Sequence, residues 1–198
     1  MAGVLTFYSD SRQWAWEKIF DREAQLHVEI GAGKGDFLME AASRFPHIDY
    51  VGIEKVPTIL YAAARKNQEH PVPNLRFLLM DASEMVAVFP PGSIDRIYLN
   101  FSDPWPKNKH GSRRLTASSK LALYKELLKP GGQVHLKTDQ ERFFDFSLAA
   151  FVQEGWSVGK ICRDLYSSGM EGNIASEYEQ RFASLGHPIY RMEAWRKQ

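Results

Sequence analysis

The stretch VEIGAGKGDFL, residues 28–38, decides the fold. It joins an apolar run to a segment with apolar residues at helical spacing, and Gly31, Gly33 and Gly35 lie between the two. Glycines at such a junction let the backbone turn tightly and let a ligand approach it closely. The order of strand, glycine loop and helix therefore predicts a cofactor site at the end of the strand. A tight turn that binds nothing is the plainer interpretation of the same glycines.

The alternation that begins there continues along the chain. Short runs rich in β-branched and aromatic residues predict strands at 27–31, 50–54, 75–80, 95–100 and 133–138. Segments between them predict helices at 36–45, 57–69, 82–89 and 116–129. Strands separated by helices imply parallel strands with helices on both faces, and the runs at 156–166 and 187–195 suggest a final antiparallel pair. We therefore expect a Rossmann-like α/β sheet.

Length and composition limit the class of protein. The 198 residues suit one domain, which we divide into a short N-terminal helical extension (1–26, with a helix at about 11–20), a cofactor-binding core (27–155) and a C-terminal substrate-binding segment (156–198). A single cysteine excludes a disulfide framework within the chain and indicates a reducing compartment. The chain has no apolar run long enough to span a membrane and no signal-peptide pattern. We therefore expect a cytoplasmic protein.

The glycine spacing and a neighbouring carboxylate indicate which cofactor is bound. The loop has the pattern G-x-G-x-G rather than the G-x-G-x-x-G that is typical of pyrophosphate-binding dinucleotide folds, and Glu29 lies in the strand before it. A carboxylate there would repel a pyrophosphate, but it suits the ammonium group of S-adenosylmethionine. The sequence therefore favours S-adenosylmethionine over a nicotinamide cofactor.

Further carboxylates follow the strands in step. Glu54 ends the second predicted strand, Asp81 follows the third and Asp103 follows the fourth. The carboxyl ends of parallel strands form the edge where open α/β folds bind ligands, so we expect these residues near Glu29. Glu54 suits a ribose diol and Asp81 an adenine amino group. A helix N-cap is the alternative role for Asp81.

The segment after the fourth strand, NFSDPWPKNKHGSRRLT (100–116), predicts a nucleic-acid site. Two prolines stiffen the chain around Trp105, which could stack on a base while Asp103 accepts hydrogen bonds from guanine. A rigid turn with Trp105 in the core is the alternative. The whole chain has a net charge of only +1, but nine basic residues oppose four acidic ones between 97 and 142. This local excess favours a polyanionic substrate.

Two segments nearer the C-terminus are ambiguous. Ser176 and Glu179 form a capping-box pattern that opens a helix, and Asp139 either ends the fifth strand or caps the next helix. Neither a serine or cysteine nucleophile motif nor a metal-ligand spacing is evident, so no metal is expected.

Six motifs distributed along the chain resemble one known family. They are VEIGAGKG (28–35), GIEK (52–55), DRIYLNFSDPWPK (95–107), RRLT (113–116), KTD (137–139) and EGN-x-x-x-EYEQRF (171–182). Together they resemble the bacterial tRNA (guanine-N7-)-methyltransferases over roughly residues 26–196. The resemblance implies a class I methyltransferase fold, with seven mostly parallel strands and an antiparallel last strand. It also implies methyl transfer from S-adenosylmethionine to N7 of guanine 46 in the tRNA variable loop.

The resemblance assigns roles residue by residue. It implies that Asp103 is catalytic and that the cofactor ligands are Glu29, Gly31, Gly33, Gly35, Glu54, Asp81 and Asp103. It implies that the substrate-binding residues are Lys107, Lys109, Arg113, Arg114, Asp139, Ser176, Glu177, Tyr178 and Glu179. The chain has Ser176 where the family usually has Thr, and its N-terminal arm is short and slightly acidic. A monomer and a homodimer both agree with the sequence.

We considered three other functions, and one feature of the sequence speaks against each. A class I methyltransferase with another substrate would not need the basic segment. A non-catalytic RNA-binding module would not need a carboxylate at the end of each of four strands. The glycine spacing and Glu29 do not fit the cofactor site of a nicotinamide dehydrogenase.

Overall fold

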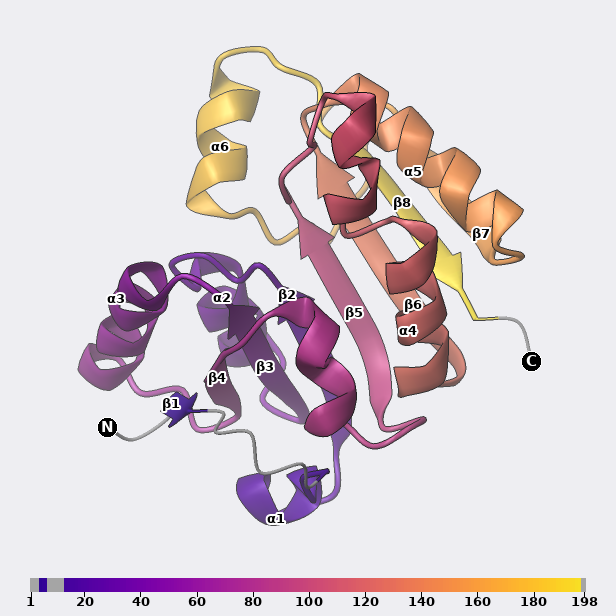
Figure 1. Ribbon diagram of the computed structural model, residues 1–198. Coiled ribbons are helices and arrows are strands. Elements are labelled where there is room, and N and C mark those ends of the chain that lie inside the picture. The colour runs from indigo at the N-terminus through magenta and orange to yellow at the C-terminus, as the bar shows by residue number, and fades with distance from the viewer. Residues whose placement is uncertain (1–3, 7–12, 197–198) are drawn as a thin grey trace.

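The computed structural model describes residues 4–6 and 13–196, and in these residues eight strands form one sheet (Figure 1). The strands are β1 (Val4–Thr6), β2 (Gln25–Ile30), β3 (Ile48–Glu54), β4 (Leu75–Leu79), β5 (Ile94–Asn100), β6 (Leu128–Thr138), β7 (Ser157–Cys162) and β8 (Tyr190–Trp195). The α-helices are α1 (Trp16–Phe20), α2 (Asp36–Arg44), α3 (Pro57–Glu69), α4 (Ser118–Leu127), α5 (Glu141–Gln153) and α6 (Glu177–Ser184). Two 3₁₀ helices are η1 (Ala82–Ala87) and η2 (Asn108–Arg113).

The strand order is β1-β4-β3-β2-β5-β6-β8-β7. Strands β2 to β6 pair in parallel, and β8 runs antiparallel to both β6 and β7. This arrangement confirms the predicted seven-stranded sheet of the class I methyltransferase fold, with its antiparallel last strand. An additional short strand, β1, which the sequence did not predict, lies parallel to β4 at the edge.

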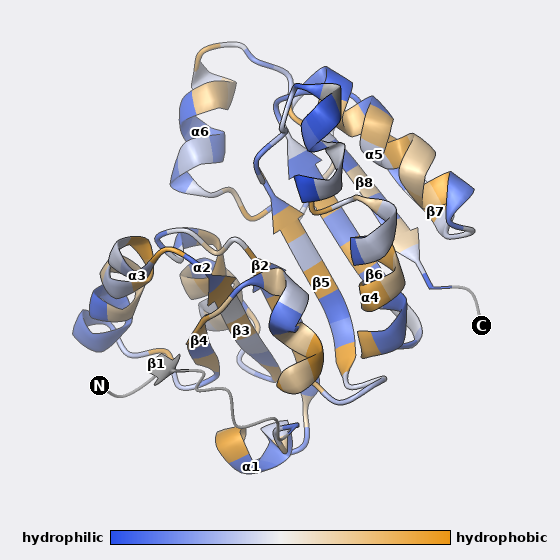
Figure 2. Ribbon diagram, viewed as in Figure 1, coloured by the Kyte–Doolittle hydropathy of each residue, from blue (hydrophilic) through white to orange (hydrophobic). Residues whose placement is uncertain are grey.

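Helices cover both faces of the sheet and bury separate apolar clusters. On one face, side chains from α1, η1, α4 and α5 pack on the strands around Met85, Phe89, Tyr124 and Phe144. On the other face α2 and α3 pack on β3 and β4. In Figure 2 orange segments recur along the strands, because strands covered by helices on both faces are apolar almost throughout. Every residue of β3 is buried.

Several boundaries differ from the predictions. The helix expected at about 11–20 begins only at Trp16, whose ring stacks on Phe89 at 4.8 Å between centroids; residues 11–12 lie outside the described residues. The segment expected as a helix at 82–89 is the 3₁₀ helix η1, capped by Asp81. Strand β6 begins at Leu128, five residues before the predicted strand, because Leu128 already pairs with Ile94 of β5. Residues 129–132 form an irregularity in the register, and regular pairing resumes at Gln133. The polar stretch before the last strand contains α6, which lies above the carboxyl edge of the sheet (Figure 1).

Candidate active site

Two cavities lie at the carboxyl edge of the sheet, and Gly31 and Phe101 line both. The first, which we call the Glu29 cavity, has a volume of about 350 Å³ and lies between the glycine loop and α6. The second, which we call the Glu54 cavity, has a volume of about 590 Å³. Among its lining residues are Glu54, Asp81, Asp103, Trp105 and Arg113. The fold therefore brings all four carboxylates that the sequence singled out to one edge.

The glycine loop leaves open space on its cavity side. Gly31 and Gly33 have positive φ angles of 79° and 57°, and a Cβ atom added at either one would meet no other atom within 4 Å. The backbone N–H groups of Gly31 and Ala32 both donate to the carbonyl of Ile53, which joins the loop to the end of β3. A ligand can therefore lie directly against this backbone.

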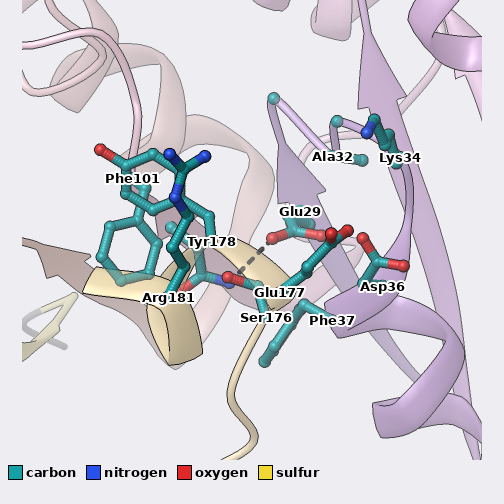
Figure 3. A pocket seen from close by; sticks show the side chains of 13 residues that line it. Glu29, Ala32, Lys34, Asp36, Phe37, Phe101, Ser176, Glu177, Tyr178 and Arg181 are labelled. Carbon is teal, nitrogen blue, oxygen red and sulfur yellow. Dashed lines mark hydrogen bonds between the residues drawn. The ribbon is translucent and has the colours of Figure 1, made fainter. Parts of the chain in front are cut away.

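Glu29 is buried and only half satisfied. Its side chain, 3% exposed, accepts a hydrogen bond at Oε1 from Asn100 Nδ2 at 2.8 Å (dashed line in Figure 3). Its Oε2 has no partner among the described residues. Burial raises the pKa of Glu29 to about 8, although the hydrogen bond from Asn100 and the charge of Lys137 act in the opposite direction. A buried carboxylate oxygen without a donor is unfavourable, so the site suits a cationic hydrogen-bond donor.

Glu54 is held by backbone groups at the end of β3. Its Oε1 accepts from the N–H groups of Lys55 and Val56, at 2.8 and 2.9 Å, and its Oε2 accepts from Gly33 N at 3.1 Å. These bonds fix the carboxylate and tie it to the glycine loop. Each oxygen retains accepting capacity toward the Glu54 cavity, which the side chain lines.

Asp81 forms the capping box that was the alternative in the sequence. It accepts from the N–H of Ser83 at 2.9 Å, and Glu84 accepts in return from Asp81 N at 3.2 Å. The hydroxyl and the backbone N–H of Ser83 hold the pKa of Asp81 below its ordinary value. Because Asp81 also lines the Glu54 cavity, the cap fixes the direction of its carboxylate rather than excluding a ligand.

The loop after β5 presents Asp103 to the Glu54 cavity and holds Trp105 in a strained conformation. Trp105 is half-buried and has a φ of 41°, a left-handed value that costs a residue with a side chain about 1–2 kcal/mol. Arg114 stabilises this shape, since its Nε donates to the carbonyl of Pro104 at 3.0 Å and its terminal nitrogen to that of Trp105 at 2.9 Å. The guanidinium of Arg113 lies over the Trp105 ring at 5.0 Å. Trp105 therefore faces the cavity rather than the core.

The basic residues of this segment divide into two groups. Lys107, Lys109 and Arg113 are exposed, and Arg113 also lines the Glu54 cavity. Arg114, in contrast, is only 8% exposed and packs on the Phe146 ring at 4.1 Å. Its donors are directed at the loop, so the geometry favours a structural role for Arg114 over the phosphate contact that the resemblance suggested.

Helix α6 forms the opposite wall of the Glu29 cavity. Ser176, Glu177 and Tyr178 line it. Figure 3 shows Ser176 and Glu177 close to Glu29, whereas the hydroxyl of Tyr178 points away from it. Ser176 caps α6 by accepting from Glu179 N at 3.2 Å. The N-cap of α5 is Gln140, so Asp139 does not cap this helix. The carboxylate of Asp139 instead accepts a hydrogen bond from the hydroxyl of Tyr178 at 3.5 Å. Glu179 is completely buried and does not line the cavity.

Three residues that the sequence reasoning did not select contribute to the site. Asn100 holds Glu29, Phe101 lies between the two cavities, and Lys137 forms a buried ion pair with Glu179. Asn100 ends the apolar strand β5 and Phe101 follows it, and only Ser102 separates them from the DPWP motif, so their place was a usable signal. Lys137 lies in the KTD motif, but a lysine inside a strand gives no indication of a buried partner 42 residues away.

The fold and the paired cavities at the carboxyl edge define a class I methyltransferase. A family model described as "Putative methyltransferase" matches residues 23–192, which is most of the chain. The protein belongs to this family, which is that of the bacterial tRNA (guanine-N7-)-methyltransferases. It is therefore an S-adenosylmethionine-dependent methyltransferase.

Solved structures of other methyltransferases share the fold. An antibiotic-related methyltransferase is 15% identical, with a TM-score of 0.66 over 95% of this chain and 98% of that one. A precorrin-6y C5,15-methyltransferase from Geobacter metallireducens is 16% identical, with a TM-score of 0.61 over 87% and 82%. A Haemonchus contortus phosphoethanolamine N-methyltransferase in complex with S-adenosylmethionine is 15% identical, with a TM-score of 0.59 over 91% and 51%. At this identity the likeness concerns the fold alone.

The residues at the edge fit S-adenosylmethionine. The unpartnered Oε2 of Glu29 is a suitable acceptor for an ammonium group. The open space beside Gly31 and Gly33 leaves room for an extended ligand along the loop. Within residues 4–6 and 13–196, no group of His, Cys, Asp and Glu could hold a metal ion. No helix in that part of the chain is long and apolar enough to cross a membrane.

Proposed function

We propose that this protein methylates N7 of guanine 46 in the variable loop of tRNA. The observation that carries the proposal is the loop after β5: Asp103 and Trp105 line the Glu54 cavity in a conformation fixed by Arg114. A fixed aromatic plane beside a carboxylate suits a guanine, because the ring can stack on the base while the carboxylate accepts from the base's N1 and N2 donors.

The cofactor residues in this proposal are the glycines of the loop together with Glu29, Glu54 and Asp81. Glu29 accepts from the ammonium group, Glu54 from the ribose hydroxyls and Asp81 from the adenine amino group. The two cavities meet at Gly31 and Phe101, so one extended ligand can reach both Glu29 and Glu54. A binding module without catalysis would not require a buried carboxylate oxygen left free at this point.

The chain's own residues position the acceptor rather than remove a proton from it. S-adenosylmethionine, when bound, supplies the methyl group on a positively charged sulfur. N7 of guanine carries a lone pair and no proton, so no side chain has to act as a base. Asp103 and Trp105 hold the base in line, and positioning of this kind contributes several kcal/mol. As the base becomes cationic, the negative charge of Asp103 stabilises the transition state more than the neutral substrate.

The exposed cations next to this loop are the proposed contacts to tRNA phosphates. Lys107, Lys109 and Arg113 are exposed and lie in the segment 97–142, where nine basic residues oppose four acidic ones. A tRNA substrate suits a cytoplasmic enzyme. We also propose that the chain forms one domain in the three parts given above, and that residues 156–198 form one side of the substrate-binding site, called the substrate side. Ser176, Glu177, Tyr178 and Asp139 belong to that substrate side.

One experiment tests the proposal directly. Unmodified tRNA is incubated with the protein and labelled S-adenosylmethionine, and its nucleosides are then separated. We expect label in N7-methylguanosine with wild-type tRNA, and none with tRNA in which guanine 46 is replaced by adenine. Label at another nucleoside, or label that survives the replacement, would overturn the assignment of the target. Free guanosine serves as the control for a small-molecule enzyme and should remain unlabelled.

A further inference from the structure

The ion pair between Lys137 and Glu179 lies beneath the wall of the Glu29 cavity. Lys137 is near the end of β6 and is 6% exposed, and Glu179, in the first turn of α6, is 0% exposed. The described residues that line the cavity include Ser176, Glu177 and Tyr178, but neither Lys137 nor Glu179. The pair therefore supports the wall from behind.

The accepting capacity of Glu179 is occupied within the protein. Its Oε2 accepts from Lys137 Nζ, and its Oε1 accepts from Asn173 Nδ2 at 2.6 Å and from the hydroxyl of Tyr166 at 3.3 Å. Lys137 Nζ donates in addition to Asn173 Oδ1 at 3.2 Å and to the carbonyl of Ile174 at 2.8 Å. A carboxylate that is enclosed and bonded in this way is not available to a substrate.

Apart from this pair, the contacts of α6 are only partly covered, among them the Tyr178 ring against Phe101 at 5.0 Å between centroids. Helix α6 is eight residues long, and Glu179 is its buried residue; Phe182 and Ala183 are only partly covered. An isolated helix of this length is not stable in water. A second tether is the bond from Tyr178 to Asp139, at 3.5 Å and on the exposed side. Lys137 and Asp139 thus hold α6 from the same strand end, but only the Lys137 contact is buried.

We propose that the buried Lys137–Glu179 pair positions α6, and that Glu179 is a positioning residue rather than a contact to the methyl acceptor. For the identity of the acceptor this inference rests on the proposed function. It predicts that removing either charge displaces Ser176, Glu177 and Tyr178 together, because these side chains are carried by one short helix. Loss of activity then follows from a misplaced wall.

Hydrogen exchange tests the positioning without any substrate. In Lys137→Met, amide protons of residues 180–184 should exchange roughly 10²-fold faster than in the wild type, while those of β6 keep their rates. Glu179→Gln keeps an acceptor for Lys137 and should give a smaller increase confined to the same residues. The matched control is Lys160→Met, since Lys160 pairs with a buried glutamate of this sheet, Glu193, at 3.0 Å but lies away from α6. Unchanged exchange in α6, or an equal increase in the control, would overturn the inference.

A double-mutant cycle separates positioning from substrate contact. The value of kcat/KM for the acceptor is measured for Lys137→Met, Glu179→Met and the double variant. If the pair acts as a unit, each single change should lower kcat/KM by roughly 10²-fold, and the double variant should be no worse than either, because no unpaired charge is left buried. Additive losses would show that Glu179 contacts the acceptor independently and would refute its positioning role. Failure of the wild type to methylate tRNA would refute the proposed function alone, because the exchange result does not involve tRNA.

Discussion

The raised pKa of Glu29 makes the stability of the cofactor-free protein depend on pH in a defined way. The carboxyl has an ordinary pKa of 4.5 and a folded-state pKa of about 8. Between these values the folded protein retains the proton and the unfolded chain loses it, so the free energy of unfolding falls as the pH rises. The slope is about 1.36 kcal/mol per pH unit, which gives a loss of about 3 kcal/mol between pH 4.5 and pH 7.

Glu29→Gln removes this titration while preserving the shape of the side chain. The amide oxygen still accepts from Asn100, and the amide nitrogen adds a penalty for an unpaired donor that does not vary with pH. The diagnostic quantity is therefore the change with pH, not the stability at one pH. Between pH 4.5 and pH 7 the free energy of unfolding of the variant should rise by about 3 kcal/mol relative to that of the wild type, because the variant does not undergo this loss.

Denaturant unfolding of both proteins at several pH values, without cofactor, measures this difference. His27 and His135, whose pKa values are lowered to about 3 and about 2 by burial, titrate in both proteins and cancel in the comparison. Two unfolding curves with the same pH course would show that the folded state does not hold a proton on Glu29, and the argument for its raised pKa would fail.

Four further predictions concern cofactor and substrate binding. At pH 7 the binding of S-adenosylmethionine should release close to one proton, since the ammonium group ionises Glu29; calorimetry in buffers of different ionisation enthalpy measures this, and Glu29→Gln should abolish it. Glu54→Ala should weaken cofactor binding by about 2–4 kcal/mol by titration calorimetry, and equal affinity would remove Glu54 from the site. Asp103→Asn should lower kcat by about 10²-fold with tRNA binding nearly intact. The pH profile of the wild-type rate should show no ionisation near pH 6–7, and an ionisation there that Asp103→Asn removes would show that the carboxylate acts as a base. Lys107→Ala and Lys109→Ala should each reduce the slope of log K for tRNA binding against log salt concentration by roughly 0.7–0.9, whereas Arg114→Ala should lower kcat and leave this slope unchanged. A slope that changes in Arg114→Ala would show that Arg114 contacts a phosphate.

The periodicity of the sequence was sufficient to predict the layered sheet. Helices α2 and α3 lie within a residue of their predicted bounds, because apolar spacing, Pro57 at the start of α3 and the glycines before α2 are all local signals. The short strand β1 was missed, since three residues have no period of their own and depend on the edge of β4 for their hydrogen bonds. The 3₁₀ form of η1 was missed for a similar reason, because spacing alone does not separate one tight turn from an α-helix.

The sequence by itself determined which residues meet at the carboxyl edge. Glu54 ends a parallel strand, Asp81 and Asp103 follow one, and Glu29 lies one residue before the end of β2. Topology alone brings such positions together. Which of these groups are free and which are engaged was decided only by the tertiary structure. Arg114 and Glu179 belong to motifs rich in exposed polar residues, yet both are buried, because their partners come from other parts of the chain. Burial and pairing depend on contacts between distant segments, and a linear pattern does not record them.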